Sequence, residues 1–166
     1  MIVEIFESLR AQFPDARMEL KEEKPYPWIF LQSEIIRLVC GHLKTVSGFG
    51  YLSSLSGVDR ADCFEIVYHL TSIGSKKNIT LKVRVAKNSP SVESIEPVYP
   101  SAGFFEREVF EMLGIKFEGN KDLRRLLLPE DWQGYPLRKD YKYPAEYHGI
   151  IHERGGSVDR TKKGNK

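Results

Sequence analysis

The densest group of side chains that could do chemistry is the run Glu106-Arg107-Glu108, followed by Glu111. On a helix, Glu108 and Glu111 are neighbours because residues three apart share one face. Two neighbouring carboxyl groups can act as general acid and general base when their surroundings separate their pKa values, as in glycoside hydrolases. The sequence shows no accompanying sugar-binding or oxyanion site, so a free-standing hydrolase is an alternative that only this pair supports.

The same segment also has a purely structural interpretation. The charged residues are flanked nearly all round the predicted helix by apolar ones, namely Phe104, Phe105, Val109, Phe110, Met112 and Leu113. A helix of this kind is covered on more than one side, by its own fold or by another protein. Covered carboxylates need partners, and Arg124, Arg125 and Arg138 follow downstream. We therefore expect these arginines to pair with the carboxylates of the helix.

Metal and nucleotide sites have weak support. His148 and His152 are four residues apart, but Gly149 between them weakens a helix and no third ligand has suitable spacing. Cys40 and Cys63 form no C-x-x-C pair, and two cysteines cannot supply the four thiolates of a usual iron–sulfur cluster. We expect buried thiols in a reduced, cytosolic setting. No glycine-rich phosphate-binding motif is complete.

Three helices are predicted, and the charged run lies in the third. Residues 2–13 repeat apolar side chains at three- and four-residue steps until Pro14. A second helix follows Ser33, which could cap it, and its apolar stripe is Ile35, Leu38, Val39 and Leu43. The third helix spans about 102–113, with Ser101 as its cap and Gly114 ending it in a left-handed conformation.

Four strands are predicted, at residues 28–31, 51–55, 64–70 and 79–85. The last is the clearest, because every second residue from Ile79 to Val85 is apolar and the residues between are polar. Residues 74–78 have the composition of a hairpin turn, which predicts antiparallel pairing of the last two strands. Helices and strands together predict an α+β fold.

The periodic patterns fade beyond Gly119, where turn formers, charges and aromatic residues follow one another. A long segment without regular structure indicates either function or attachment to a partner. Its tryptophan, tyrosines and arginines are typical interface anchors, and its prolines reduce the entropy lost on docking. We therefore divide the chain into an α+β domain (1–119), an extended partner-binding arm (120–154) and a disordered basic tail (155–166).

Composition limits the alternatives. The chain has 166 residues, enough for one compact domain, and its apolar stretches are too short and too interrupted by charge to span a membrane. Its acidic amino terminus does not resemble an export signal. Residues 153–166 hold five basic and two acidic residues, which leaves 20 basic and 21 acidic residues elsewhere. This balance argues against a nucleic-acid protein, although an adaptor that uses the basic tail is a further alternative.

The segment EREVFEMLGIKFEGNKDLRRLLLPEDWQGYPLRKDY, residues 106–141, resembles the hallmark region of one NADH–quinone oxidoreductase family, the thirty-kilodalton subunit of respiratory complex I. A weaker resemblance extends over most of residues 1–150. Three positions depart from the family pattern. Phe104 stands where the family usually has Trp, Glu111 where it has Asp, and Asn120-Lys121 where it has His-Pro. The last departure affects the local turn and any contact of the missing imidazole.

The resemblance implies a two-layer α+β fold with a mixed sheet, and no cofactor or catalytic residue in this chain. It implies a peripheral position on the cytoplasmic face of the membrane, beside a large hydrogenase-like subunit and iron–sulfur subunits. Iron–sulfur clusters, flavin and quinone would belong to those partners. Related membrane-bound hydrogenases, formate hydrogenlyases and archaeal reduced-cofactor dehydrogenases use similar subunits and are the alternative assemblies. The implied interface residues are Glu106, Arg107, Glu108, Arg124, Arg125, Trp132, Pro136, Leu137, Arg138, Lys139 and Asp140.

Overall fold

The computed structural model of the chain describes residues 2–23 and 25–151. In chain order its elements are α1 (Ile2–Gln12), β1 (Met18–Lys21), β2 (Trp28–Leu31), the 3-10 turn η1 (Ser33–Ile35), α2 (Ile36–Thr45), β3 (Tyr51–Asp59), β4 (Cys63–Ser72), β5 (Lys77–Ala86), β6 (Ser91–Glu93), α3 (Ala102–Leu113), β7 (Lys116–Glu118), β8 (Glu146–Tyr147) and β9 (Ile150–Ile151). No helix among the described residues is long and apolar enough to cross a membrane.

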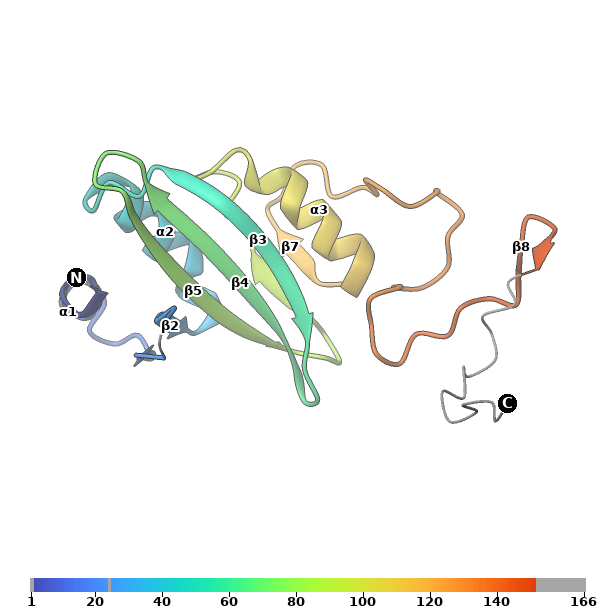
Figure 1. Cartoon of the computed structure of the whole chain (residues 1–166), viewed down its shortest axis with the longest axis horizontal. Helices are drawn as coiled ribbons and strands as arrows, with labels where there is room; N and C mark the ends of the chain where they lie inside the picture. Colours follow the sequence, from blue (N-terminus) through green and yellow to red (C-terminus); the bar gives the residue numbers. More distant parts are fainter. Residues whose placement is uncertain (1, 24, 152–166) are drawn as a thin grey trace, which may run out of the picture.

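The main sheet has five strands in the order β1-β2-β5-β4-β3 (Figure 1). β2 and β5 are parallel and the other pairs are antiparallel, so the sheet is mixed, as the resemblance implied. The expected hairpin joins β4 to β5. β6 and β7 form a separate parallel pair beside α3. The predicted α+β class is confirmed.

The core lies between one face of the main sheet and the helices. Alternate residues of β4 and β5 turn inward, because side chains along a strand point to opposite faces. Leu9 of α1 and Val39 of α2 are fully buried against them. α3 packs on β3 at Gly57, where an added Cβ would lie 2.5 Å from Leu113 Cδ1. The helices therefore form one layer and the sheet the other, which leaves the opposite face of the sheet open.

Several predictions about individual elements were wrong. Ser33 lies in the 3-10 turn, and α2 begins at Ile36 without a side-chain cap; Ser101 likewise forms no capping hydrogen bond. Leu38, assigned to the buried stripe, is 59% exposed. The strands at 51–55, 64–70 and 79–85 are longer than predicted, and β1, β6 and β7 were missed. Gly114 does end α3 in the left-handed conformation, with φ 73°.

The two cysteines differ in burial. Cys40 is fully buried and burial raises the pKa of its thiol, whereas Cys63 is only half-buried, contrary to expectation. Both are free cysteines, and neither is near enough to other ligand residues to form a metal site: within residues 2–23 and 25–151 no three His, Cys, Asp or Glu side chains gather. His152 lies outside the described residues.

Beyond Gly119 the chain passes α3 on the side away from the main sheet and extends to β8, coloured orange to red in Figure 1. Every residue from 120 to 151 is exposed or half-buried. The segment is irregular as predicted, apart from the short hairpin of β8 and β9, which the sequence did not indicate. We call residues 120–151 the arm. The proposed boundaries at 119 and 154 remain predictions, and the tail at 155–166 lies outside the described residues.

Candidate subunit interface on helix α3 and the arm

A buried carboxylate fixes the first part of the arm to α3. Glu111, 2% exposed, accepts hydrogen bonds from the backbone N–H groups of Leu126 (3.0 Å), Leu127 (2.8 Å) and Leu128 (3.1 Å). Three converging donors satisfy a buried carboxylate without a cation. The predicted pairing of the α3 carboxylates with Arg124, Arg125 and Arg138 is therefore wrong, because backbone amides supply those contacts.

The arginines bind backbone carbonyls instead. Arg107 of α3 donates to the carbonyl oxygens of Arg124 (3.0 Å) and Arg125 (2.8 Å). Arg125 in turn donates to the carbonyl of Trp132 at 2.6 Å, which closes the segment between them into a loop. The side chain of Arg124 is exposed and pairs with Asp122. α3 thus holds the arm with two side chains: the Glu111 carboxylate accepts from backbone N–H groups, and the Arg107 guanidinium donates to backbone carbonyl groups.

A second attachment lies at the end of α3. Arg138 donates to the carbonyl of Leu113 at 2.6 Å, and its guanidinium lies 4.5 Å from the ring centre of Tyr135 and 5.0 Å from that of Phe64. These cation–π contacts join the arm to a core side chain of β4. Gly114 allows the close approach, because an added Cβ would lie 2.6 Å from both Arg138 Nη2 and the Tyr135 ring.

A third attachment joins the arm to β3. Asp59 accepts a 2.8 Å hydrogen bond from the backbone N–H of Lys139 and forms an ion pair of 2.6 Å with Lys87. Burial alone would raise the pKa of Asp59, but the Lys139 amide and the Lys87 ammonium hold it below its ordinary value. Asp59 is thus charged at neutral pH and ties residues 138–140 to the strand.

Glu106 has a different place from its neighbours in the charged run. Its side chain is fully buried and accepts hydrogen bonds from Ser94 Oγ (2.7 Å), the Ile95 N–H (2.8 Å) and Asn120 Nδ2 (2.8 Å). Burial raises its pKa, although these donors oppose the change. Asn120, which departs from the family pattern, supplies one donor from the start of the arm. Without exposed surface, Glu106 positions α3 and cannot itself touch a partner.

The other predicted interface residues are divided by exposure. Exposed side chains that a partner could touch belong to Glu108, Arg124, Leu137, Lys139 and Asp140. Half-buried ones, which hold the arm in place, belong to Arg107, Arg125, Trp132, Pro136 and Arg138. Whether these residues meet another chain remains a prediction.

Sequence reasoning missed an exposed apolar part of the arm. Leu127 is 62% exposed and Leu126 38%, although both lie next to the Glu111 attachment. Leu137, which was predicted, is 61% exposed, and Phe104 of α3 is 63% exposed. The available signal was three consecutive leucines, at 126–128, in a segment with no helical or strand period. A run without such a period has no single face that it could bury in the core.

The far end of the arm is closed by a polar cluster. Asp131 accepts a hydrogen bond from the Tyr147 hydroxyl at 2.7 Å and pairs with His148 Nε2 at 2.7 Å. The Tyr147 ring lies 5.2 Å from that of Trp132. His148, offered by the sequence as a metal ligand, is engaged with a carboxylate.

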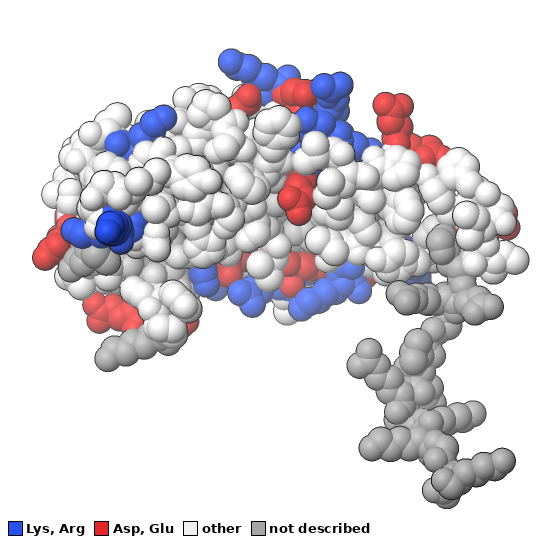
Figure 2. All heavy atoms as spheres, turned by 45° about the horizontal axis from the view of Figure 1, so that its top comes forward, with Lys and Arg blue, Asp and Glu red and all other residues white. Residues whose placement is uncertain are grey.

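The enzymatic alternative gains nothing from this geometry. All three hydrogen bonds to Glu111 come from amides that hold the arm, so its carboxylate is not presented to a substrate. Glu108 is exposed and forms no hydrogen bond or ion pair within the described part of the chain. The nucleic-acid alternative depends on the basic tail, which lies outside the described residues. On the face drawn in Figure 2, the Lys and Arg of the described residues lie among Asp and Glu, and uncharged residues cover most of the surface.

Comparison with known proteins identifies the family. The family described as "Respiratory-chain NADH dehydrogenase, 30 Kd subunit" matches residues 29–147. An NADH-quinone oxidoreductase subunit from Roseiflexus sp. (strain RS-1) is 42% identical over 147 residues, which cover 86% of this chain and 84% of the relative. An F(420)H(2) dehydrogenase subunit from Methanosarcina mazei is 39% identical over 142 residues, 83% of this chain and 90% of the relative.

A solved structure agrees with this assignment. The trypsin-resistant fragment (1-134) of Nqo5 is 28% identical, with a TM-score of 0.62, and the match covers 74% of this chain and 98% of that one. The matched family region contains both the α3 motif and nearly all of the arm. The chain therefore belongs to the family of the 30 Kd subunit of respiratory-chain NADH dehydrogenase, as residues 106–141 predicted.

Proposed function

We propose that this chain is the non-catalytic thirty-kilodalton subunit of an NADH–quinone oxidoreductase and that its arm fastens neighbouring subunits. One observation carries the proposal: the arm has no buried residue, yet three attachments to the domain hold it in place. A segment that cannot bury Leu126, Leu127 and Leu137 on its own chain can bury them against a neighbour. Family membership supports the same conclusion, because relatives are subunits of multi-subunit assemblies.

The contribution of such a subunit to electron transfer is positional. The α+β domain supplies a rigid base, and hydrogen bonds from α3 and β3 set the direction in which the arm leaves it. The attachments order the arm before any partner binds. Binding to such a preorganised segment loses less conformational entropy, so the attachments favour assembly. The proposed partners are a large hydrogenase-like subunit and iron–sulfur subunits, which would carry the iron–sulfur clusters, flavin and quinone site. The proposed location is the cytoplasmic face of the membrane, as a peripheral subunit.

A second candidate is the equivalent subunit of a related complex. The F(420)H(2) dehydrogenase relative from Methanosarcina mazei is nearly as similar as the NADH-quinone oxidoreductase relative, so the sequence of this chain does not choose the electron donor. The genes beside this one would distinguish the candidates. Nickel ligands in the adjacent large subunit would indicate a hydrogenase, and their loss would indicate a dehydrogenase.

Deletion of the gene tests the proposal. Membranes from the deletion strain should lose NADH-driven quinone reduction, and the full-length chain should restore it. Retention of full activity with NADH would contradict the assignment. Loss of activity with another donor, such as reduced F420, would select the second candidate.

A further inference from the structure

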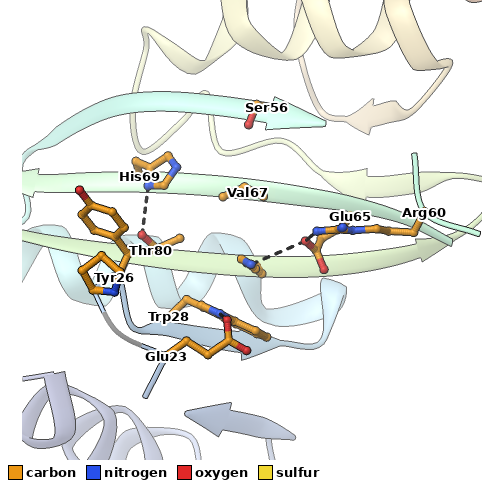
Figure 3. A pocket seen from close by; sticks show the side chains of 11 residues that line it. Glu23, Tyr26, Trp28, Ser56, Arg60, Glu65, Val67, His69 and Thr80 are labelled. Carbon is orange, nitrogen blue, oxygen red and sulfur yellow. Dashed lines mark hydrogen bonds and ion pairs between the residues drawn. The ribbon is translucent and has the colours of Figure 1, made fainter. Parts of the chain in front are cut away.

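The face of the main sheet opposite the helices is open, and a groove of about 520 Å³ crosses it (Figure 3). Side chains from β2, β3, β4 and β5 line the groove, and the loop before β2 adds Glu23 and Tyr26. No helix or strand within residues 2–23 and 25–151 packs on this face. Its residues have no part in holding the arm, so the groove is separate from the candidate interface above.

The groove carries more positive than negative charge at its centre. Glu65 is only 2% exposed, and three cations converge on it: Arg60 at 2.8 Å, Arg84 at 3.3 Å and Lys82 at 3.8 Å. Burial alone would raise the pKa of Glu65, but Arg60 and the other cations hold it below its ordinary value. Glu65 balances one of these three charges, and Glu23, which also lines the groove and accepts a 3.4 Å hydrogen bond from Trp28 Nε1, balances a second. One positive charge is therefore left, on the side of the groove near Glu65, to attract an acidic ligand.

Aromatic side chains make the wall beside these cations. Tyr26 is 80% exposed, and the half-buried Trp28 lies under Lys82, whose ammonium is 4.1 Å from the ring centre. Val67 and the hydrogen-bonded pair His69 and Thr80 form the floor, with 3.0 Å between His69 Nδ1 and Thr80 Oγ1. Burial and Lys82 lower the pKa of His69, so at neutral pH its imidazole adds no further charge.

This combination favours a polypeptide over a nucleic acid. Single-stranded nucleic acids are held by stacking of bases on open aromatic rings. Here Lys82 covers the ring of Trp28, and Arg84 lies 5.2 Å from the ring centre of Phe30. The two rings thus restrict the movement of Lys82 and Arg84. The edges of the rings, together with Tyr26, remain available for apolar contact. Aromatic and arginine side chains beside unbalanced charge are the features of a protein-binding site.

We infer that the groove between Tyr26 and Arg60 docks an extended, acidic segment of another subunit of the same assembly. Carboxylates of that segment would lie against Lys82, Arg60 and Arg84, and an apolar side chain would contact Tyr26. The inference rests on the proposed function in one respect: it assumes that the docked segment belongs to another subunit. It gives the domain a second binding surface on the side of the sheet away from the helices.

Fluorescence of Trp28 in the full chain tests the chemistry of the groove without the complex. A Trp132→Phe background leaves Trp28 as the one tryptophan, since the sequence has two. A hexaglutamate peptide should change its fluorescence saturably, and hexalysine should not. Lys82→Gln should weaken the binding of hexaglutamate about tenfold, because it removes one charge-assisted contact. Lys82→Arg should keep the affinity, and Lys116→Gln, at an exposed lysine of β7, is the matched control.

Tyr26→Ala should fold normally, because the side chain is already exposed. It should also weaken the binding of the hexaglutamate peptide. Absence of a saturable change with hexaglutamate would overturn the inference. Equal binding of inorganic phosphate or a hexameric oligouridylate would overturn it as well, because the site would then recognise any anion.

Photo-crosslinking identifies the occupant inside the assembled complex. With p-benzoylphenylalanine at Ser56, an exposed groove residue, the cross-linked peptide should come from another subunit and contain Asp or Glu. Absence of a cross-link, or a link to a segment without acidic residues, would overturn the inference. Neither result touches the proposed function, which the deletion strain tests separately.

Discussion

The carboxylate of Glu111 accepts a 2.8 Å hydrogen bond from the backbone N–H of Leu127, although Leu127 itself points its side chain into solvent. The same carboxylate binds the amides on either side of it. A helix therefore grips the arm by its backbone and leaves the leucine side chains free. This arrangement separates the groups that hold the arm from the groups that could meet a partner.

Replacement of Glu111 by Ala should release the arm without unfolding the domain. Hydrogen bonds to a charged acceptor contribute about 1.5–3 kcal/mol, so the free energy of unfolding should fall by about 2 kcal/mol. Amide hydrogen exchange of residues 126–128 should become fast, because the variant removes their acceptor. Glu108→Ala on the same helix is the control and should change stability by less than about 0.5 kcal/mol. Unchanged protection of these amides in Glu111→Ala would contradict the assignment.

Gly114→Ala should disturb both the end of α3 and the arm. The residue has φ 73°, a conformation that costs a side-chain-bearing residue about 1–2 kcal/mol. The new methyl group would also meet Arg138 and Tyr135. Thermal unfolding should therefore occur at lower temperature. Gly41→Ala is the matched control, because Gly41 lies inside α2 with open space around it and Ala there should be neutral or stabilising by up to about 1 kcal/mol. An equal effect of both substitutions would be inconsistent with this account.

Glu106 should give the protein a measurable pH dependence. Its folded pKa is raised above the ordinary value of 4.5, so its contribution to stability is fully present below pH 4.5 and is lost as pH rises through the folded pKa. In Glu106→Gln the new side chain cannot accept from all three donors. Its free energy of unfolding should therefore be lower than that of the wild type by about 1–3 kcal/mol at pH 5. The loss should be smaller at pH 8, because the wild type gains a buried charge as pH rises through the folded pKa. Urea unfolding at the two pH values measures the difference; a loss that grows with pH would refute the explanation.

The sequence predicted well those elements whose local pattern and tertiary role agree. The alternation in residues 79–85 placed β5, and Gly114 marked the end of α3 by its conformational freedom. β6 and β7 were missed because each has three residues and exists only through pairing with the other, from Ser91 to Lys116. Ser33 was a reasonable cap for a helix, but the 3-10 turn satisfies the backbone there.

The candidate interface was only partly predictable for a related reason. Residue types predicted that the carboxylates of α3 would be covered and would need partners, which is true of Glu106 and Glu111 but not of the exposed Glu108. Their partners are mainly backbone amides and a serine hydroxyl, which no charge pattern in the sequence reveals. The exposure of Leu126 and Leu127 likewise depends on how Glu111 turns the backbone, and no periodicity in the arm encodes it.

Affinity purification of the tagged full-length chain from its own cells tests the central claim most directly. Leu127→Glu places a charge on the exposed side of the arm, and Leu38→Glu does the same on α2, where the leucine is similarly exposed at 59% against 62%. The wild type and Leu38→Glu should bring down the large subunit of the complex in equal amounts, and Leu127→Glu should lose most of it while remaining folded. Full recovery of the large subunit with Leu127→Glu would contradict the role given to the arm.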